Sequence, residues 1–244
     1  MSIEIFSGLD QGLLWIGENT SPALPSAGLI RIALPLGWGI VLAAALAWAF
    51  EWQLKRRHAG SFMSSGRKAG SSRSTWLAIG IALVGVVLPE PLSPAYWLGL
   101  AFQMPSLTLI FLCGAALIDH LTGRGFAGER NNVSKFGPPA ARWHGVDRAM
   151  TLAGVLLGWV LLLDTFALLP VSVYPWGFGS SALVAMSLVA VLPWLLAGHR
   201  DALFLPLVVA VFVALRLPTG NLWDALMDPW LWLLLHWRLM RPAK

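Results

Sequence analysis

Clusters of lysine and arginine alternate with long apolar segments along this chain. The clusters fall between every second apolar segment and contain 15 of the 17 basic residues, leaving only Arg31 and Arg216 outside them. This alternation is typical of a polytopic membrane protein whose basic loops remain in the cytoplasm. It predicts an all-α integral membrane protein with a defined orientation. The clustered residues are Lys55, Arg56, Arg57, Arg67, Lys68, Arg73, Arg124, Arg130, Lys135, Arg142, Arg148, Arg200, Arg238, Arg241 and Lys244.

The composition agrees with this class. Apolar residues make up 57% of the chain and charged residues 12%, which is about half of the charged share of a soluble domain. The mean hydropathy is +0.69. The net charge of +5 comes from the basic clusters, which would lie beside anionic lipid headgroups. We therefore expect membrane lipids as partners and no binding of nucleic acid.

The apolar stretches predict the number of spans, because a helix needs about 20 residues to cross the hydrocarbon layer. Seven stretches qualify, and the alternative is six spans with the last stretch lying in the interface. Pro105 and Pro229 interrupt the third and the seventh stretch, where we expect kinks. The stretches are 29–50, 75–89, 94–118, 149–170, 180–198, 202–217 and 222–237.

The loops predict the orientation of this single bundle, which covers residues 29–244. The loops at 51–74 and 119–148 contain eleven basic residues and should be cytoplasmic, whereas the turns at 89–93 and 171–179 contain none. Short loops rich in lysine and arginine stay on the cytoplasmic side. We therefore predict an outer amino terminus, a cytoplasmic carboxy terminus and multi-pass insertion into the bacterial cytoplasmic (inner) membrane.

The remaining segments fit the same topology. Residues 1–28 contain three acidic and no basic side chains, so we interpret them as an interfacial amphipathic segment and not as a secretory signal. Residues 59–75 are rich in glycine and serine and predict a flexible linker. The chain is rich in tryptophan, and most of the fourteen lie near predicted span ends, as in aromatic belts.

A few polar residues fall inside the predicted spans. Ionisable groups in a membrane cost about 2.5–3.5 kcal/mol each on insertion scales and suggest a function. Asp164 lies in the fourth stretch, and Arg31, Arg216 and Asp228 map to the same outer depth. Asp164 paired with Arg31 or Arg216 could form a cavity that binds a solute or ion, but a structural ion pair is the favoured interpretation. Gln103 could coordinate a substrate or satisfy a carbonyl freed by the nearby proline.

All five histidines map to the predicted cytoplasmic side. His120, His199 and His236, together with Asp119, are candidate ligands for a metal or haem. No two histidines have the spacing of paired ligands within one span, and histidine near a helix C-terminus also interacts favourably with the helix dipole. We expect no resident cofactor, and a metal or haem site is the alternative.

Motifs with a catalytic mechanism are missing from the sequence. It has no phosphate-binding glycine loop, no nucleophile elbow and no zinc-protease helix motif. This favours a protein that is not an enzyme. Gly154 and Gly158 are spaced for close approach of another helix in a membrane, and we interpret them as packing residues.

Three functions remain open at this point. The favoured one is a non-catalytic subunit or assembly factor of a larger membrane complex, whose protein partners would bind the cytoplasmic loops. The second is a small transporter of a solute or ion that uses the charged cluster around Asp164. The third is a membrane enzyme, or a haem or metal protein, that uses the histidines.

Overall fold

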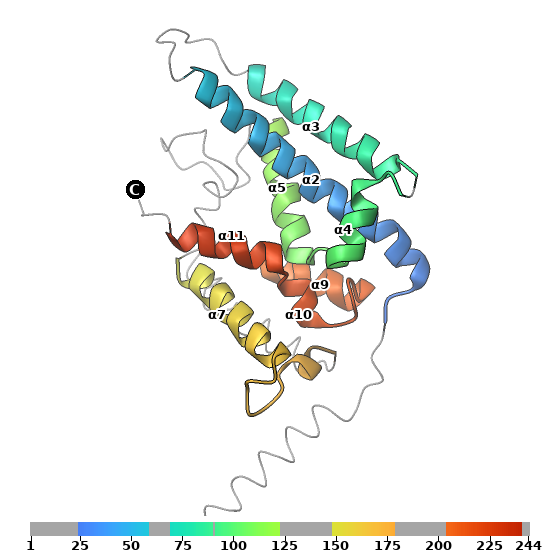
Figure 1. Cartoon of the computed structure of the whole chain (residues 1–244), viewed down its shortest axis with the longest axis vertical. Helices are drawn as coiled ribbons and strands as arrows, with labels where there is room; N and C mark the ends of the chain where they lie inside the picture. The colour runs from blue at the N-terminus through green and yellow to red at the C-terminus, as the bar shows by residue number, and fades with distance from the viewer. Residues whose placement is uncertain (1–23, 59–68, 90, 123–147, 179–203, 241–244) are drawn as a thin grey trace, which may run out of the picture. The chain divides into compact units, whose positions relative to one another are not determined.

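The computed structural model describes residues 24–58, 69–89, 91–122, 148–178 and 204–240. This part of the chain is helical and contains no strand, which confirms the all-α class (Figure 1). The elements are α2 (Ala27–His58), α3 (Ala69–Val87), α4 (Pro94–Phe102), α5 (Leu107–Thr122), α7 (Arg148–Thr165), the 3-10 helix η2 (Tyr174–Phe178), α9 (Phe204–Leu215), α10 (Leu222–Leu226) and α11 (Pro229–Met240).

One helix of the described chain is long and apolar enough to cross a membrane. It is the Ala27–Gln53 part of α2. The other apolar helices are shorter, and at a rise of about 1.5 Å per residue they fall below the roughly 30 Å hydrocarbon layer. They cover Thr75–Val87, Leu107–Leu121, Met150–Thr165 and Phe204–Leu215.

Two predicted spans are not continuous helices. In the third, α4 ends at Phe102 and α5 begins at Leu107, and in the seventh, α10 ends at Leu226 and α11 begins at Pro229. The kinks expected at the prolines are full breaks. Proline has no amide hydrogen and disfavours helical geometry in the residue before it, whereas it is well suited to the first position of a helix. Pro229 is accordingly the first residue of α11, whereas Pro105 lies in the break two residues before α5 begins.

The predicted cytoplasmic loops are shorter than expected. The prediction of a loop over 51–74 is wrong at both ends, because α2 continues to His58 and α3 begins at Ala69. Similarly, α5 continues to Thr122. The residues after Phe50 are good helix formers, and long basic side chains can extend beyond the apolar layer while the backbone stays helical. The amphipathic segment predicted for 1–28 and the fifth span lie almost wholly outside the described residues.

The chain divides into two compact units. In one of them, α2 and α3 run side by side (Figure 1). Their contact is built from alanines, which let two helix backbones approach closely, and α5 adds Leu117 to it. We call this group the alanine seam. Its buried residues are Ala43, Ala44, Ala47, Ala78, Ala82 and Leu117.

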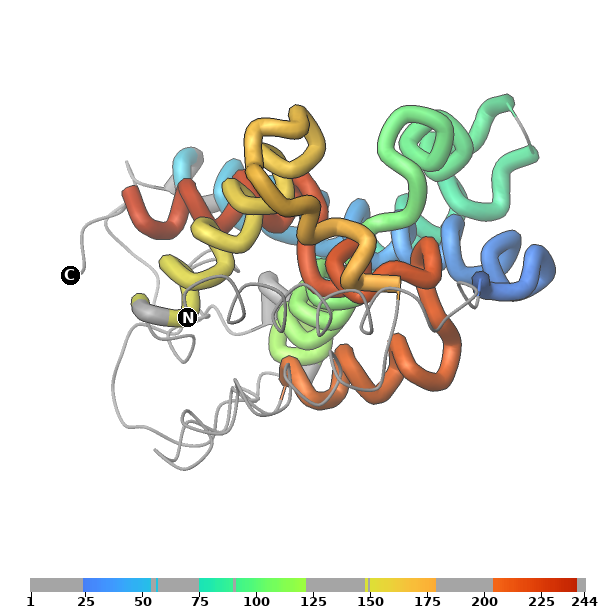
Figure 2. Tube along the Cα trace, turned by 90° about the horizontal axis from the view of Figure 1, so that it is seen from below, coloured from blue at the N-terminus to red at the C-terminus, as the bar shows by residue number. Residues whose placement is uncertain are grey.

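The other unit contains α7, η2, α9, α10 and α11 together with Ser106–Thr108. Its α7 and α11 pack against each other, as Figure 2 also shows. A methyl group at Gly154 would lie 2.7 Å from Leu235, and one at Gly158 would overlap the indole of Trp232. The prediction that these glycines allow close helix packing is confirmed, and α11 is the helix that occupies the space.

Candidate functional site

Asp164 organises the segment that follows α7. Its carboxylate accepts hydrogen bonds from the backbone amides of Val173 at 3.0 Å and Tyr174 at 2.7 Å, and from the Ser172 hydroxyl at 3.1 Å. Tyr174 is the first residue of η2, and the first amides of a helix have no partner within it. The carboxylate therefore caps η2, and its negative charge stabilises the exposed amides.

A second carboxylate extends this arrangement to α10. The Tyr174 hydroxyl donates to Asp224 at 2.8 Å, and the Thr219 hydroxyl makes a short hydrogen bond to the same oxygen. Burial, and then the hydrogen bond to Asp224, raise the pKa of the Tyr174 phenol well above its ordinary value. The phenol therefore remains a hydrogen-bond donor throughout the physiological pH range.

Asn221 joins η2 to α10 by backbone contacts. It is fully buried, its side-chain oxygen accepts from the amide of Trp223 at 2.9 Å, and its side-chain nitrogen donates to the Tyr174 carbonyl at 3.1 Å. The Trp223 indole donates to the Val173 carbonyl at 3.1 Å. Gly177 lies against them so closely that a Cβ atom would overlap Asn221. We call Asp164, Thr219, Asn221, Trp223, Asp224 and the η2 residues that they bind the η2 cluster.

The Asp228 carboxylate accepts hydrogen bonds at the starts of two helices. One oxygen accepts from the amide of Leu231 in α11 at 2.7 Å, and the other accepts from the amide of Ser106 at 2.7 Å. Ser106 immediately precedes α5. The Thr108 hydroxyl also donates to the carbonyl of Ala225 in α10 at 3.3 Å. A carboxylate at two helix N-termini interacts favourably with both helix dipoles. The sequence indicated the breaks at the prolines but gave no sign of this connection.

The two arginines that the sequence suggested as partners of Asp164, Arg216 and Arg31, lie in other parts of the chain. Arg216 follows the last residue of α9 in a left-handed conformation, with φ of 56°, and its guanidinium lies 5.4 Å from the ring of Phe212. Within the described chain there is no ion pair between Asp164 and Arg216. Arg31 lies in α2, in the other compact unit. Asp164 thus takes its hydrogen bonds from local backbone and hydroxyl groups.

Gln103 lies at the break between α4 and α5. Its φ of 59° and ψ of −149° fall in a region that is almost restricted to glycine. Its amide donates to the Gly99 carbonyl at 3.0 Å, and its carbonyl accepts from the indole of the buried Trp38 at 2.7 Å. The backbone of Gln103 therefore has a clear structural role in connecting the two helices.

His120 forms a pair that the sequence did not predict. Its Nδ1 atom lies 2.7 Å from Oε1 of Glu51, and both side chains are buried. Glu51 comes from the end of α2 and His120 from α5. The only sequence signal was a single carboxylate directly after a long apolar run. Because the partner is set by the register of two distant helices, the sequence could not identify it.

The other histidine candidates do not join this pair. The Nδ1 atom of His236 lies 2.9 Å from the Trp232 carbonyl, and its ring packs edge-on against the Trp232 ring at 4.4 Å. Asp119 is half-buried in α5, and His199 lies outside the described residues. No group of three or more histidine, cysteine, aspartate or glutamate side chains in the described chain could hold a metal ion.

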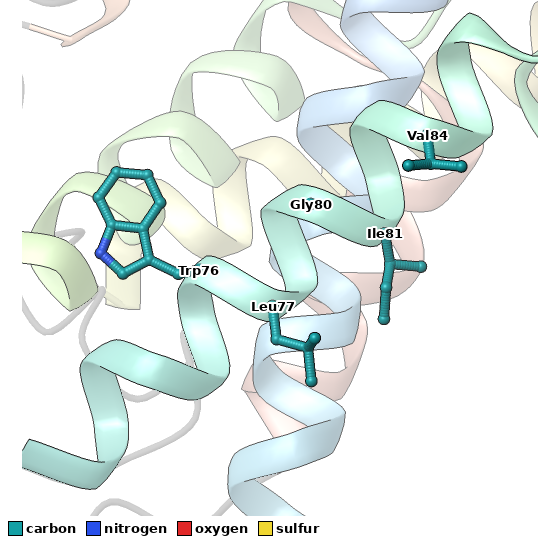
Figure 3. A pocket seen from close by; sticks show the side chains of 5 residues that line it. All are labelled: Trp76, Leu77, Gly80, Ile81 and Val84. Atoms are coloured by element: carbon teal, nitrogen blue, oxygen red, sulfur yellow. The ribbon is translucent and has the colours of Figure 1, made fainter.

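An apolar groove of about 420 Å³ runs along α3. Figure 3 shows its side chains projecting from this one helix. At its centre is Gly80, where a Cβ atom would meet nothing within 4 Å. The groove is lined by Trp76, Leu77, Gly80, Ile81 and Val84.

Comparison with known proteins gives no assignment for this arrangement: no protein-family model, curated protein or solved structure matches the chain. Three carboxylates, those of Asp164, Asp224 and Asp228, accept hydrogen bonds from backbone amides and hydroxyl groups at helix ends. This chemistry orders loops and connects helices.

Proposed function

We propose that this chain is a multi-pass protein of the bacterial cytoplasmic membrane that acts as a non-catalytic subunit or assembly factor of a larger complex. The proposal includes seven spans, an outer amino terminus and a cytoplasmic carboxy terminus. It rests on the basic clusters of the sequence and on the one helix that is long enough to cross a membrane.

The interrupted helices are compatible with this topology. α4 and α5 are separated by four residues, and α10 and α11 by two. In each pair the two helices together would cover one span that neither could cover alone. Broken helices occur in membrane proteins where neighbouring groups satisfy the freed backbone atoms. Asp228 does this for the amides of Ser106 and Leu231.

The observation that carries the proposed function is the use of the carboxylates. Asp164 binds three donors that all lie within ten residues of it along the chain. Asp224 binds the hydroxyls of Tyr174 and Thr219. To bind a solute, these carboxylates would first have to break their hydrogen bonds to these donors. They are therefore better suited to stabilising the fold than to binding a solute. This favours a structural subunit over a transporter.

The test is the composition of the protein after mild extraction from native membranes. We expect the 26.4 kDa chain to elute together with a second polypeptide in a constant ratio. A matched preparation of the Asp164→Asn variant should lose this polypeptide only in the fraction that has unfolded. A monodisperse monomer, free of other proteins in several mild detergents, would contradict the proposal.

A transporter is the second candidate, and one observation favours it. The starts of α5 and α11, each following a helix break, share the carboxylate of Asp228. Secondary transporters often bind substrates between discontinuous helices whose N-termini point at an anionic group. If Asp228→Asn abolished a measured flux and left the unfolding temperature unchanged, this candidate would replace the first.

A further inference from the structure

Two tryptophans and an arginine follow one another along the exposed face of α2, near the end of the helix. Trp48 is 37% exposed and Trp52 is 44% exposed, and Arg56 is exposed as well. Because these positions are four residues apart, their side chains lie on one side of the helix. Ala47 and Glu51, on another side of the same turns, are buried. We call Trp48, Trp52 and Arg56 the tryptophan–arginine stripe.

The ring of Trp52 holds the side chain of Arg56 in place. The guanidinium carbon lies 3.5 Å from the centre of this ring, where the negative face of an indole attracts a cation. The five N–H groups of a guanidinium lie in its plane, so stacking on a ring leaves them able to donate to another group. The contact therefore restrains a long, flexible side chain and keeps its donors available.

No carboxylate of the described residues pairs with Arg56. The ion pair that these residues form joins His120 to Glu51, and Glu51 is the only acidic residue of α2. In the sequence, Lys55 and Arg57 flank Arg56 and add charge of the same sign. A guanidinium has donors and no acceptor. The stripe thus ends in a positive charge that an anion with several acceptor oxygens would complement.

The position of the stripe along α2 matches the edge of a lipid bilayer. The part of α2 that is long and apolar enough to cross a membrane ends at Gln53, directly after Trp52. Arg56 lies three residues further, which is about 4.5 Å along the helix axis. The polar headgroup region adds about 5–7 Å on each side of the hydrocarbon layer. If α2 crosses the membrane, the guanidinium therefore lies at the depth of the lipid headgroups.

We propose that the tryptophan–arginine stripe binds the phosphate group of an anionic phospholipid in the cytoplasmic leaflet, where such lipids give the surface its negative potential. Arg56 donates to the phosphate oxygens, and Trp52 positions the guanidinium. Trp48 lies beside the first part of the acyl chains, as is usual for an indole at the interface. The site goes beyond the proposed function, but it rests on one part of it, that α2 crosses the membrane.

The apolar part of the stripe favours a lipid over a free phosphate ion. A free ion would need the guanidinium alone, whereas the two exposed indoles extend the surface toward the middle of the helix. Ala45, one turn before Trp48, is exposed as well and continues this surface. An anionic group joined to apolar chains matches both ends of the stripe.

The test is lipid binding by the purified full-length chain in a neutral detergent, measured by native mass spectrometry with added phosphatidylglycerol or phosphatidylcholine. We expect phosphatidylglycerol to bind at least about fivefold more tightly. Arg56→Gln should lower this affinity at least about tenfold, because charge-assisted hydrogen bonds to the phosphate are lost. Since Arg56 is exposed, the variant should fold, and an unchanged unfolding temperature checks this.

Matched variants separate a specific site from a general attraction between charges. Arg57→Gln removes the same charge one position along α2 and should change the affinity less than about twofold, because an exposed charge outside the site is screened. Arg56→Lys keeps the charge but loses the planar, bidentate group, so it should not restore wild-type binding. Trp52→Leu should weaken binding about two- to fivefold. Trp76→Leu changes an exposed tryptophan of α3 and should have no effect.

Three outcomes would overturn the proposal. They are equal affinities for the two lipids, equal losses in Arg56→Gln and Arg57→Gln, and displacement of phosphatidylglycerol by inorganic phosphate at the same concentration, which would show that the site takes the free ion. Failure of the proposed function gives a different result. Absence of a co-eluting polypeptide would leave lipid binding unchanged, whereas recovery of the chain in the soluble fraction would contradict both proposals.

Discussion

The carboxylate of Asp228 and the backbone amide of Ser106 lie 2.7 Å apart, although they are far apart in sequence. The same carboxylate caps α11 through Leu231. One side chain therefore fixes the starts of two helices, each directly after a break.

Replacing Asp228 tests this double role. Asp228→Ala should lower the free energy of unfolding by about 2–4 kcal/mol, because two hydrogen bonds to a charged group are lost. Asp228→Ser keeps an oxygen that can cap α11 but cannot reach both amides, so it should recover only part of the loss. Thermal unfolding in detergent measures the difference. Equal stabilities for Asp228→Ser and the wild type would argue against the contact with Ser106.

We expect the Asp164 carboxylate to stabilise the folded protein. Asp164→Asn retains one acceptor oxygen but loses the charge that faces the amides of Val173 and Tyr174. We expect a loss of about 1–3 kcal/mol, seen as a lower unfolding temperature, with normal insertion into the membrane. Ser172→Ala removes only one exposed donor and should cost much less. An Asp164→Asn variant as stable as the wild type would contradict this role.

Close packing of α7 on α11 makes Gly158 intolerant of larger residues. In Gly158→Ala the new methyl group would overlap the Trp232 indole, and we expect a loss of about 1–3 kcal/mol. Gly80→Ala is the matched control, since its Cβ meets no atom within 4 Å and alanine favours a helix by about 1 kcal/mol. The two variants should therefore shift the unfolding temperature in opposite directions.

The backbone of Gln103 predicts an unusual stabilising substitution. Glycine adopts its φ of 59° and ψ of −149° without strain, so Gln103→Gly should raise the free energy of unfolding by about 1 kcal/mol. Gln103→Ala keeps the strain and removes only the side chain. If both variants are destabilised equally, the side-chain amide and not the backbone is what matters at this position.

The Tyr174 phenol predicts a loss of stability in alkaline solution. Its pKa is raised in the folded protein by burial and by the hydrogen bond to Asp224. A raised pKa gives stability that is fully present below the unfolded value, about 10, and that is lost as the pH rises toward the folded value. Denaturant unfolding between pH 8 and 11 should show a steeper decline for the wild type than for Tyr174→Phe. Parallel declines would contradict the raised pKa.

Several features could be predicted from the sequence because they depend on local pattern alone. Hydropathy and the alternation of basic clusters with apolar segments predict an all-α chain, and the spacing of Gly154 and Gly158 predicts close helix packing, now seen with α11. Pro105 and Pro229 marked the positions of the breaks. Whether each proline would kink the helix or break it completely could not be predicted. That outcome depends on which groups accept hydrogen bonds from the freed backbone amides.

The contacts of the candidate site depend on the relative register of segments that are distant in sequence. The sequence therefore could not predict them. Glu51 meets His120 only because the ends of α2 and α5 come together in one compact unit. Asp164 was expected to need a cationic partner, but the loop after α7 folds back and supplies two amides and a hydroxyl. The conformation of such a loop is not encoded in hydropathy or charge pattern.

Labelling of single cysteines tests most directly whether the chain crosses the membrane repeatedly in the proposed orientation. In a Cys113→Ser background, one cysteine is placed at Ser65, between α2 and α3, and another at Val171, an exposed position after α7. A reagent that cannot cross membranes should label Val171→Cys in intact cells, and Ser65→Cys only after the cells are opened. Labelling of both from the same side, or recovery of the chain in the soluble fraction, would contradict the proposed topology.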